Sequence, residues 1–209
     1  MADELVFYTH PMSRGRIVRW MLEETGARYR TEILTFDGSM KEAGYLAVNP
    51  LGKVPAIRHG ETVVTEAAAV CAYLADAFPA AGLAPPPAER GDYYRWLFFA
   101  AGPLEMTVAL KWLDVKVPDD RRRAIGCGDY PAVMDSLALA VSRHPYVAGD
   151  RFTAADVYVA SHIAWGTHFG GIESRPAFLA YLERLATRPA AIRAAALDDA
   201  EAARLPEAG

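Results

Sequence analysis

The start of the chain combines short apolar runs with one segment of helical periodicity. Residues 5–10 and 29–34 predict strands, the first by its apolar run and the second by its alternation. Between them, residues 14–25 repeat apolar side chains at helical spacing, and Gly26 fits the position that ends a helix. Two strands joined through a helix need a crossover, so we expect them to be parallel. The pattern predicts a β-α-β unit.

A predicted hairpin and a helix follow this unit. Residues 39–47 are expected to form a short, irregular helix, and residues 53–58 and 62–65 then predict two strands. The segment between these strands has the length of a hairpin connection, so the pair should be antiparallel. Residues 66–78 carry an apolar stripe at helical spacing. Together with the β-α-β unit, these elements predict a small α/β layer.

The second half of the chain repeats apolar residues only at helical spacing. Residues 89–113 predict a long helix that Gly102–Pro103 should kink or break, because proline removes a backbone hydrogen bond. Thr153, with Asp156 after it, forms a capping-box pattern at the start of another helix. Two further helix starts are marked by prolines that suit a first turn, Pro131 and Pro176. This half is expected to be all-helical.

These patterns divide the chain into two predicted domains. Residues 1–80 hold the α/β layer, and residues 81–88 form a linker rich in proline and alanine. Residues 89–209 form the helical domain. The expected fold class is therefore α/β followed by all-α.

Composition and charge exclude several kinds of partner. The 209 residues are 52% hydrophobic and 23% charged, as in an ordinary globular protein. The net charge of -4 gives no reason to expect nucleic acid, and the basic run Arg121–Arg123 follows two aspartates, which indicates a solvated helix start. No apolar stretch approaches the ~18–20 residues of a membrane span. The N-terminus carries acidic residues where a signal peptide needs basic ones, so we expect a cytoplasmic protein with no membrane partner.

Cysteine and histidine positions indicate neither a disulfide framework nor a metal site. The chain has two cysteines, Cys71 and Cys127, and no C-x-x-C motif. Cys71 falls on an apolar helix stripe and is expected to be inert core, whereas the sequence around Cys127 allows exposure and gives it no role. The five histidines lack the spacing of metal ligands, so no metal is expected.

Two local irregularities point to chemistry. Pro55 interrupts an apolar strand, where it cannot donate to a sheet ladder, so the backbone either marks an irregular edge or bonds something outside its own sheet. Ser13 precedes a helix at an N-cap position, yet Arg14 and Arg16 occupy the first turn, near the positive end of the helix dipole. An anion-binding site and two solvated arginines explain this arrangement about equally well.

Four segments of the chain read, in order, SRGRIVRWMLEETG, NPLGKVPAI, TEAAAVCAYLADAFP and AGDRFTAADVY. Through these segments the chain resembles the cytosolic glutathione transferase family over nearly its whole length. The resemblance, which is to the bacterial members that use a serine, implies a thioredoxin-like domain followed by an all-helical domain. It also implies glutathione as co-substrate, a hydrophobic small-molecule electrophile that the glutathione thiolate attacks, and a homodimer.

The resemblance also assigns residues to a glutathione site. In the family, the proline that matches Pro55 is cis, and the residue before it pairs its backbone with the cysteinyl unit of glutathione, as in β-augmentation. The γ-glutamyl end is assigned to Glu66 and the residue after it, while Lys53 is a candidate for a carboxylate and Arg14 a weaker one. The implied glutathione-binding residues are Arg14, Lys53, Val54, Pro55, Glu66 and Ala67.

Ser13 is the residue that we expect to activate the thiol, by analogy with the subclasses that use a serine at the start of this helix. A hydroxyl hydrogen bond to a thiolate contributes about 1.5–3 kcal/mol, close to the ~2.7 kcal/mol that lowers a thiol pKa by two units. The loops before this helix vary in length, so Thr9 and Tyr8 stay open as alternatives. If one of them contacts the thiol, Ser13 has only a plain N-cap role. No cysteine lies between 8 and 16, which argues against the cysteine-using subclasses.

Ala67 departs from the family pattern, which usually has serine or threonine after the acid. The missing hydroxyl hydrogen bond costs about 1.5–3 kcal/mol unless something replaces it, so we expect weakened glutathione affinity. The departure also keeps a non-catalytic binding or scaffold protein open as an alternative. Peroxidase or isomerase chemistry would use the same thiolate, whereas the absent C-x-x-C motif disfavours a thioredoxin-type disulfide oxidoreductase.

Aromatic residues crowd the first long helix of the helical domain. We expect core and dimer contacts to account for most of them, and the resemblance implies that one or two line the electrophile pocket. They are Tyr93, Tyr94, Trp96, Phe98, Phe99 and Trp112.

Overall fold

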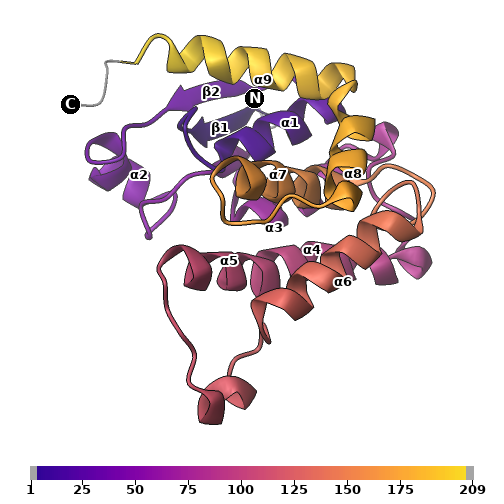
Figure 1. Ribbon diagram of the computed structural model, residues 1–209. Coiled ribbons are helices and arrows are strands. Elements are labelled where there is room, and N and C mark those ends of the chain that lie inside the picture. Colours follow the sequence, from indigo (N-terminus) through magenta and orange to yellow (C-terminus); the bar gives the residue numbers. More distant parts are fainter. Residues whose placement is uncertain (1–3, 206–209) are drawn as a thin grey trace. The chain divides into compact units, whose positions relative to one another are not determined.

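The computed structural model describes residues 4–205 and divides them into two compact units (Figure 1). Unit 1 contains the described residues up to Gly82 together with those from Thr187 onward, and unit 2 contains Leu83–Ala186. Residues 1–3, which carry part of the argument against a signal peptide, lie outside the described residues. None of the helices between residues 4 and 205 combines the length and the apolar character needed to cross a bilayer.

Unit 1 is built on a four-stranded mixed sheet whose strand order is β2-β1-β3-β4. β1 pairs with β2 in parallel and with β3 antiparallel, and β3 pairs antiparallel with β4. The predicted β-α-β unit and hairpin are therefore confirmed. The strands are β1 Leu5–Thr9, β2 Arg30–Ile33, β3 Ala56–His59 and β4 Thr62–Thr65.

Helices cover both faces of this sheet. The helices α1 (Gly15–Thr25) and α3 (Ala67–Ala77) pack against each other and against the sheet, and both bury the apolar stripes that the sequence showed. On the other face, Met40 and Tyr45 pack against Ala56. They come from the predicted irregular helix, which is a 3₁₀ turn, Ser39–Lys41, followed by the short helix α2, Ala43–Leu46.

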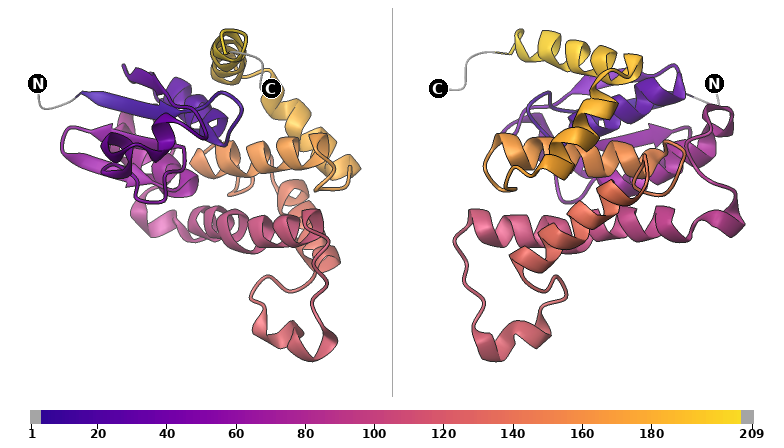
Figure 2. Two further views of the ribbon diagram at one scale, coloured as in Figure 1. Left: turned by 90° about the vertical axis from the view of Figure 1, so that its left-hand side faces the viewer. Right: turned by 45° about the vertical axis from the view of Figure 1, so that its right-hand side comes forward.

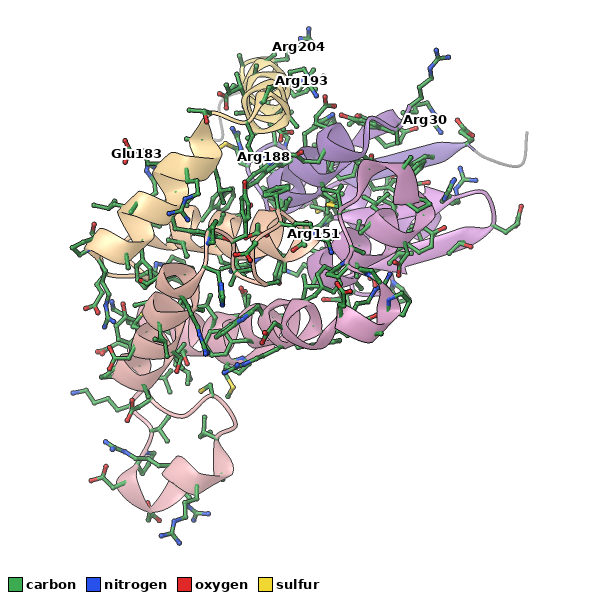
Figure 3. All side chains as sticks on the ribbon, turned by 90° about the vertical axis from the view of Figure 1, so that its right-hand side faces the viewer. Arg30, Arg151, Glu183, Arg188, Arg193 and Arg204 are labelled. Atoms are coloured by element: carbon green, nitrogen blue, oxygen red, sulfur yellow. The ribbon has the colours of Figure 1, made fainter. Side chains whose placement is uncertain are left out.

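The last helix, α9 (Pro189–Ala202), packs against α1 and so belongs to unit 1, whereas the sequence placed it in the domain 89–209. Ion pairs explain the attachment, since Arg188 bonds Glu24 at 2.6 Å and Arg193 bonds Glu23 at 3.1 Å. Figure 3 shows Arg188 just before this helix and Arg193 on it. The periodicity of residues 189–202 predicts a helix, but it carries no signal for the partner of that helix.

Unit 2 is helical, as predicted. The long helix at its start continues through Gly102–Pro103 by a π-helical turn, Ala100–Leu104, because Pro103 has no N–H to donate to the regular ladder. The segment between α5 and α6 extends away from the other helices of this unit (Figure 2). The helices are α4 Gly91–Phe99, α5 Glu105–Trp112, α6 Tyr130–Arg143, α7 Ala154–His168 and α8 Pro176–Ala186.

The helix starts of unit 2 confirm the local signals. Pro131 and Pro176 lie in the first turns of α6 and α8. Thr153 and Asp156 form the predicted capping box of α7. The Asp156 carboxylate is fully buried and also accepts hydrogen bonds from the Val147 N–H at 2.7 Å and the Tyr181 hydroxyl at 2.8 Å. It therefore ties the start of α7 to two other segments.

Candidate functional site

The register of the sheet brings three chain segments to one edge. Tyr8 of β1 lies opposite Ala56 of β3, and Ala56 lies opposite Thr65 of β4. Adjacent strands are about 4.8 Å apart. The loop that follows β1, the residues that precede β3 and the residues that follow β4 therefore meet at the same end of the sheet. These segments contain nearly all the candidate residues.

The segment before β3 leaves its own sheet at the proline. The Val54–Pro55 peptide bond is cis, as the resemblance implied, and β3 begins only at Ala56 rather than at residue 53. The Lys53 carbonyl accepts bonds from the Tyr45 hydroxyl at 2.5 Å and from Asn49 Nδ2 at 2.8 Å. Val54 makes no hydrogen bond to any residue between 4 and 205. Its backbone N–H and C=O are thus available to a ligand at this edge.

Two lysines flank this free backbone. Lys53 is exposed, and Lys41 is exposed and donates from Nζ to the carbonyl of Gly52 at 2.9 Å. Sequence reasoning missed Lys41, because only the fold brings residue 41 next to residue 52. The structure thus supplies two lysine side chains at the segment that precedes Val54.

Glu66 occupies an unusual backbone conformation at the edge of the sheet. Its φ of 64° is positive, which costs a non-glycine residue about 1–3 kcal/mol. The side chain is exposed and does not cap α3, and no residue between 4 and 205 bonds it. Such strain is typical of functional positions. The N–H of buried Ala67, the first residue of α3, is among those that a helix leaves without an intrahelical partner.

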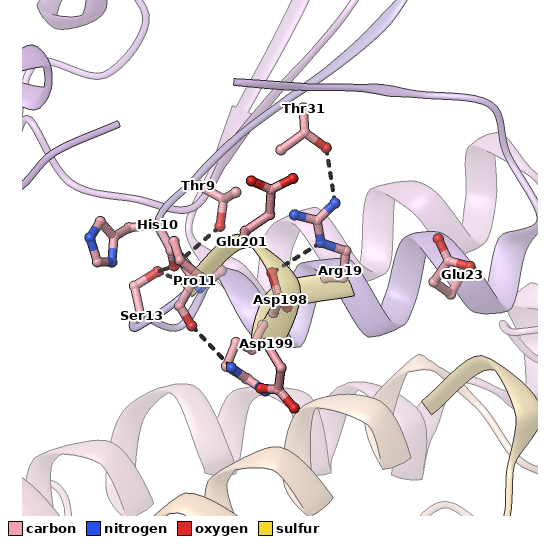
Figure 4. A network of polar contacts seen from close by, with 12 residues as sticks. Thr9, His10, Pro11, Ser13, Arg19, Glu23, Thr31, Asp198, Asp199 and Glu201 are labelled. Atoms are coloured by element: carbon pink, nitrogen blue, oxygen red, sulfur yellow. Dashed lines mark hydrogen bonds and ion pairs between the residues drawn. The ribbon is translucent and has the colours of Figure 1, made fainter. Parts of the chain in front are cut away.

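Ser13 lies immediately before α1 and is half-buried (Figure 4). Its Oγ donates to the His10 carbonyl at 2.7 Å and accepts the Gly15 N–H at 2.9 Å. Arg14 is the N-cap residue by its backbone position, one residue later than expected, although Ser13 provides the capping oxygen. A hydroxyl has one proton to donate, so Ser13 must release the His10 carbonyl in order to donate to a ligand.

The two alternatives to Ser13 occupy different surroundings. Thr9 is completely buried beneath Gly15, where an added Cβ would lie 1.8 Å from Thr9 Oγ1. Tyr8 points to the opposite face, where its ring packs on Tyr45 and its hydroxyl accepts from Arg58 Nε at 3.5 Å. Of the three hydroxyls, that of Ser13 alone combines partial exposure with the start of α1.

His10 is a residue that sequence reasoning left without a role. It directly follows β1, and its ring packs against Phe36 at a tilt of 39°, with centroids 4.1 Å apart. Nδ1 accepts the Met12 N–H at 3.1 Å, which assigns the ring proton to Nε2. Burial lowers the pKa of His10, so the imidazole is held neutral. The one feature of the sequence that could have pointed to His10 is its position at the carboxyl end of a predicted strand.

Arg16 is a structural residue and not an anion ligand. Its guanidinium donates to the Pro11 carbonyl at 3.3 Å and to the Asp199 carboxylate at 2.5 Å, which ties the loop before Ser13 to α9 (Figure 4). Arg14 is exposed beside it. Arg16, one of the two arginines that break the helix-dipole rule, is therefore engaged in contacts within the protein.

A buried ion pair fixes α9 to the middle of α1. Arg19 Nε bonds Asp198 Oδ1 at 3.1 Å, with 3% and 0% of the two residues exposed. The guanidinium also lies 5.1 Å from the Phe7 ring centroid and donates to Thr31 at 2.9 Å. Burial raises the pKa of Asp198, and the Arg19 charge opposes that rise. α1, whose start follows Ser13, is thus tied to α9 by a buried ion pair.

Neither cysteine offers an exposed thiol to the candidate site in unit 1. Cys71 is fully buried, and burial raises the pKa of its thiol, as expected of inert core. Cys127, for which the sequence allowed exposure, is 6% exposed and lies in unit 2. Within residues 4–205, no three histidine, cysteine, aspartate or glutamate side chains cluster as a metal site requires.

Comparison with known proteins shows which family the chain belongs to. Two family models match the chain, described as the N-terminal and the C-terminal domain of glutathione S-transferase, over residues 12–77 and 128–189. Glutathione S-transferase A of Pleuronectes platessa is 32% identical over 81% of this chain and 80% of its own length. The chain belongs to the glutathione S-transferase family. The N-terminal match includes Ser13, Val54 and Glu66.

Solved transferase structures support the same assignment. A glutathione transferase from Methylococcus capsulatus superposes with a TM-score of 0.77 at 28% identity, covering 94% of this chain and 99% of that chain. A theta-class glutathione S-transferase from Xanthomonas axonopodis pv. citri, solved with glutathione bound, gives 0.72 at 28% identity over 92% and 97%. The disulfide-bond oxidoreductase YghU of Escherichia coli is 29% identical over 74% of this chain and 58% of its own length.

Proposed function

We propose that this protein binds glutathione at the sheet edge where β1, β3 and β4 meet and activates its thiol for attack on a hydrophobic electrophile. The observation that carries the proposal is the Val54 backbone, which has no partner between residues 4 and 205 and lies beside three converging segments. A peptide ligand satisfies such a backbone by adding one strand residue. The cysteinyl unit of glutathione is that residue.

The charges around this edge suit the two ends of glutathione. The exposed Glu66 carboxylate takes the ammonium of the γ-glutamyl unit, and the N–H of Ala67 at the start of α3 takes its carboxylate. Lys53 and Lys41 take the glycyl carboxylate, with Arg14 as a weaker partner. Pro55 orients Val54 in this arrangement.

Ser13 supplies the hydrogen bond that favours the thiolate. When the glutathione sulfur arrives, the Ser13 proton turns from the His10 carbonyl to the sulfur, while its oxygen keeps the Gly15 N–H. The hydroxyl contributes about 1.5–3 kcal/mol, and the start of α1 adds about 0.3–1 kcal/mol. Their sum reaches the ~2.7 kcal/mol that a lowering of the thiol pKa by two units requires.

Ala67 weakens the γ-glutamyl end of this site. Serine or threonine there would give the ligand carboxylate a hydroxyl partner, worth about 1.5–3 kcal/mol. The transferase is therefore expected to bind glutathione less tightly than relatives with the hydroxyl.

A homodimer accounts for the exposed apolar side chains of α4 and α5. Tyr93 and Trp96 are buried in unit 2, but five large apolar side chains on these helices or directly after them are exposed, namely Tyr94, Phe98, Met106, Trp112 and Leu113. Exposed large apolar side chains, where they gather on one surface, are typical of interaction sites. Light scattering should give a dimer for the natural protein and a monomer for a Phe98→Glu, Trp112→Glu variant. Ile192→Glu, an exposed position on α9, is the control that should remain dimeric.

Calorimetric titration tests the proposed activation. Glutathione is titrated at about pH 6.5–7 in two buffers of different ionisation heat, with S-methylglutathione as a ligand that has no thiol proton. Release of close to one proton with glutathione, and none with S-methylglutathione, supports a stabilised thiolate. Binding without proton release contradicts activation and returns Ser13 to a capping role. No binding at millimolar glutathione contradicts the whole site and favours the scaffold alternative.

Turnover assays separate the chemical alternatives that share the thiolate. Conjugation of a chloronitrobenzene supports the transferase. Activity confined to a hydroperoxide or to a small disulfide instead assigns the site to peroxidase or disulfide-reductase chemistry, and the similarity to YghU makes the disulfide worth including.

A further inference from the structure

Unit 2 contains a cavity of about 280 Å³ between α5, the segment after it and the start of α6. All of its lining residues belong to unit 2, so no residue of the proposed glutathione site takes part. Its size is near the lower end of small-molecule pockets. The lining residues are Thr107, Leu110, Lys111, Val115, Val117, Arg122, Cys127, Gly128, Asp129 and Tyr130.

One polar corner of the cavity is rich in hydrogen-bond donors. Lys111 Nζ lies 4.0 Å from the Tyr130 ring centroid and donates to the Tyr130 hydroxyl at 2.9 Å. The same hydroxyl oxygen accepts the Glu173 N–H at 2.9 Å. Since both of these partners are donors, the phenolic proton of Tyr130 has no acceptor between residues 4 and 205.

Thr107 lies in the cavity wall, but its hydroxyl does not face the cavity. The residue is 4% exposed, and its Oγ1 is covered and has no hydrogen-bond partner between residues 4 and 205. A helical threonine can bond the carbonyl four residues before it, here that of Pro103 in the π-helical turn, but Thr107 makes no such bond. The donors that a ligand can meet in this corner are therefore those of Lys111 and Tyr130.

The charges of the lining favour an anion of single charge. Lys111 and Arg122 are cationic, and Arg122 Nε is paired with Asp119 at 3.0 Å. The one carboxylate of the lining, that of Asp129, accepts the Ala132 N–H at 2.9 Å and so caps α6. The negative charge of Asp129 repels a doubly charged phosphate more strongly than it repels a singly charged carboxylate.

The remaining walls are apolar. They are formed by Leu110, Val115, Val117 and the thiol-bearing Cys127. An apolar ligand body that packs against such walls loses contact with water, and the favourable free energy is proportional to the area covered. A simple inorganic anion would leave these walls uncovered.

From these features we infer that unit 2 carries a second binding site, for a small monocarboxylate with a short apolar body. The carboxylate is bound by Lys111, with the hydroxyl of Tyr130 as a further donor, and Arg122 adds positive charge at the rim. The apolar body rests on Leu110, Val115 and Val117. This site goes beyond the proposed transferase activity and does not depend on it.

Benzoate is a suitable probe, titrated into the full-length protein by calorimetry or by ligand-observed NMR. Benzamide, which has the same shape and no charge, is expected to bind at least about tenfold more weakly. Equal binding of benzoate and benzamide overturns the inference, as does the absence of benzoate binding up to about 10 mM. If inorganic phosphate binds as tightly as benzoate, the apolar walls play no part and the inference is wrong.

Variants locate the binding. Lys111→Met, which keeps an apolar stem, is expected to weaken benzoate at least about tenfold. Lys116→Met is the matched control, because Lys116 is exposed in the segment after α5 and does not line the cavity. Tyr130→Phe removes the second donor and keeps the aromatic ring. The inference fails if folded Lys111→Met and Tyr130→Phe both bind benzoate as the natural protein does.

Discussion

The Ser13 hydroxyl donates to the carbonyl oxygen of His10 at 2.7 Å and at the same time accepts the Gly15 N–H at 2.9 Å. The side chain is thus held in one orientation at the start of α1 before any ligand arrives. Only the first of these bonds has to be exchanged for a bond to sulfur, because a thiolate accepts the proton that the carbonyl now receives. The same residue therefore serves as a cap and as the proposed thiol activator.

Ser13→Ala is expected to lower kcat/KM for conjugation by about 10- to 150-fold, which corresponds to a lost hydrogen bond of about 1.5–3 kcal/mol. The pKa of bound glutathione should rise by about one to two units, which the pH dependence of thiolate absorbance measures. Ser136→Ala is the matched control, since Ser136 is an exposed serine of α6 that bonds only the Ala132 carbonyl. If Ser13→Ala leaves the thiol pKa unchanged, Ser13 is merely a cap.

Ala67→Ser is expected to tighten glutathione binding by about tenfold or more, because it restores a hydroxyl to the first turn of α3 where the γ-glutamyl carboxylate is proposed to bind. Calorimetry measures the dissociation constant directly. Ala69→Ser, two residues later and exposed, is the control and should leave the affinity within about twofold. Equal affinity of Ala67→Ser and the natural protein would place the γ-glutamyl end elsewhere.

Local signals predicted most of the fold. The capping box of Thr153 and Asp156 and the first-turn prolines depend on contacts within one helical turn, so they can be recognised from the sequence. Hairpin length likewise predicted the pairing of β3 with β4. The convergence of Ser13, Val54 and Glu66 came from the family resemblance, and the register explains it afterwards.

Contacts between distant segments could not be predicted in this way. Arg19 and Asp198 are far apart in the chain, and nothing in either local pattern pairs them. Lys41 bonds the Gly52 carbonyl from 11 positions earlier in the chain, and no local pattern predicts that contact. Cys127 is 6% exposed and lines a cavity whose walls come from three different segments.

His10 predicts a loss of stability in mild acid. Burial lowers its pKa in the folded state, so the unfolded chain binds the proton more readily. The free energy of unfolding is therefore fully retained above the unfolded pKa of about 6.5 and falls as the pH drops below it, by at most about 1.4 kcal/mol per pH unit. Urea denaturation at pH 7.5, 6.5 and 5.5 should show this fall.

A His10→Gln variant isolates that contribution from other acidic groups. The difference in pH dependence between the natural protein and the variant cancels the titration of Asp156 and Asp198, whose carboxyls remain in both. His168→Gln, at an exposed position of α7, is the control and should keep the natural profile. Identical pH profiles for His10→Gln and the natural protein would show that the buried imidazole is not destabilised by protonation.

The buried pair of Arg19 and Asp198 predicts a sharp contrast between two neighbouring aspartates. Asp198→Asn leaves the Arg19 charge buried without its counter-ion and should reduce the free energy of unfolding by about 3–5 kcal/mol. Asp199→Asn is the matched control, because the Asp199 side chain is 68% exposed and its bond to Arg16 is worth about 0–1 kcal/mol. Urea denaturation measures both values.

A double replacement separates loss of the charge pair from loss of packing. Arg19→Met with Asp198→Leu removes both charges and keeps apolar volume between α1 and α9, so it should recover most of the stability that Asp198→Asn loses. If Asp198→Asn and Asp199→Asn have equal effects, the Arg19 charge is not desolvated and α9 is held by its apolar contacts. If the double variant has no higher free energy of unfolding than Asp198→Asn, removing the buried Arg19 charge gives no stabilisation. The stability of the natural protein then depends on the geometry of the Arg19–Asp198 pair itself.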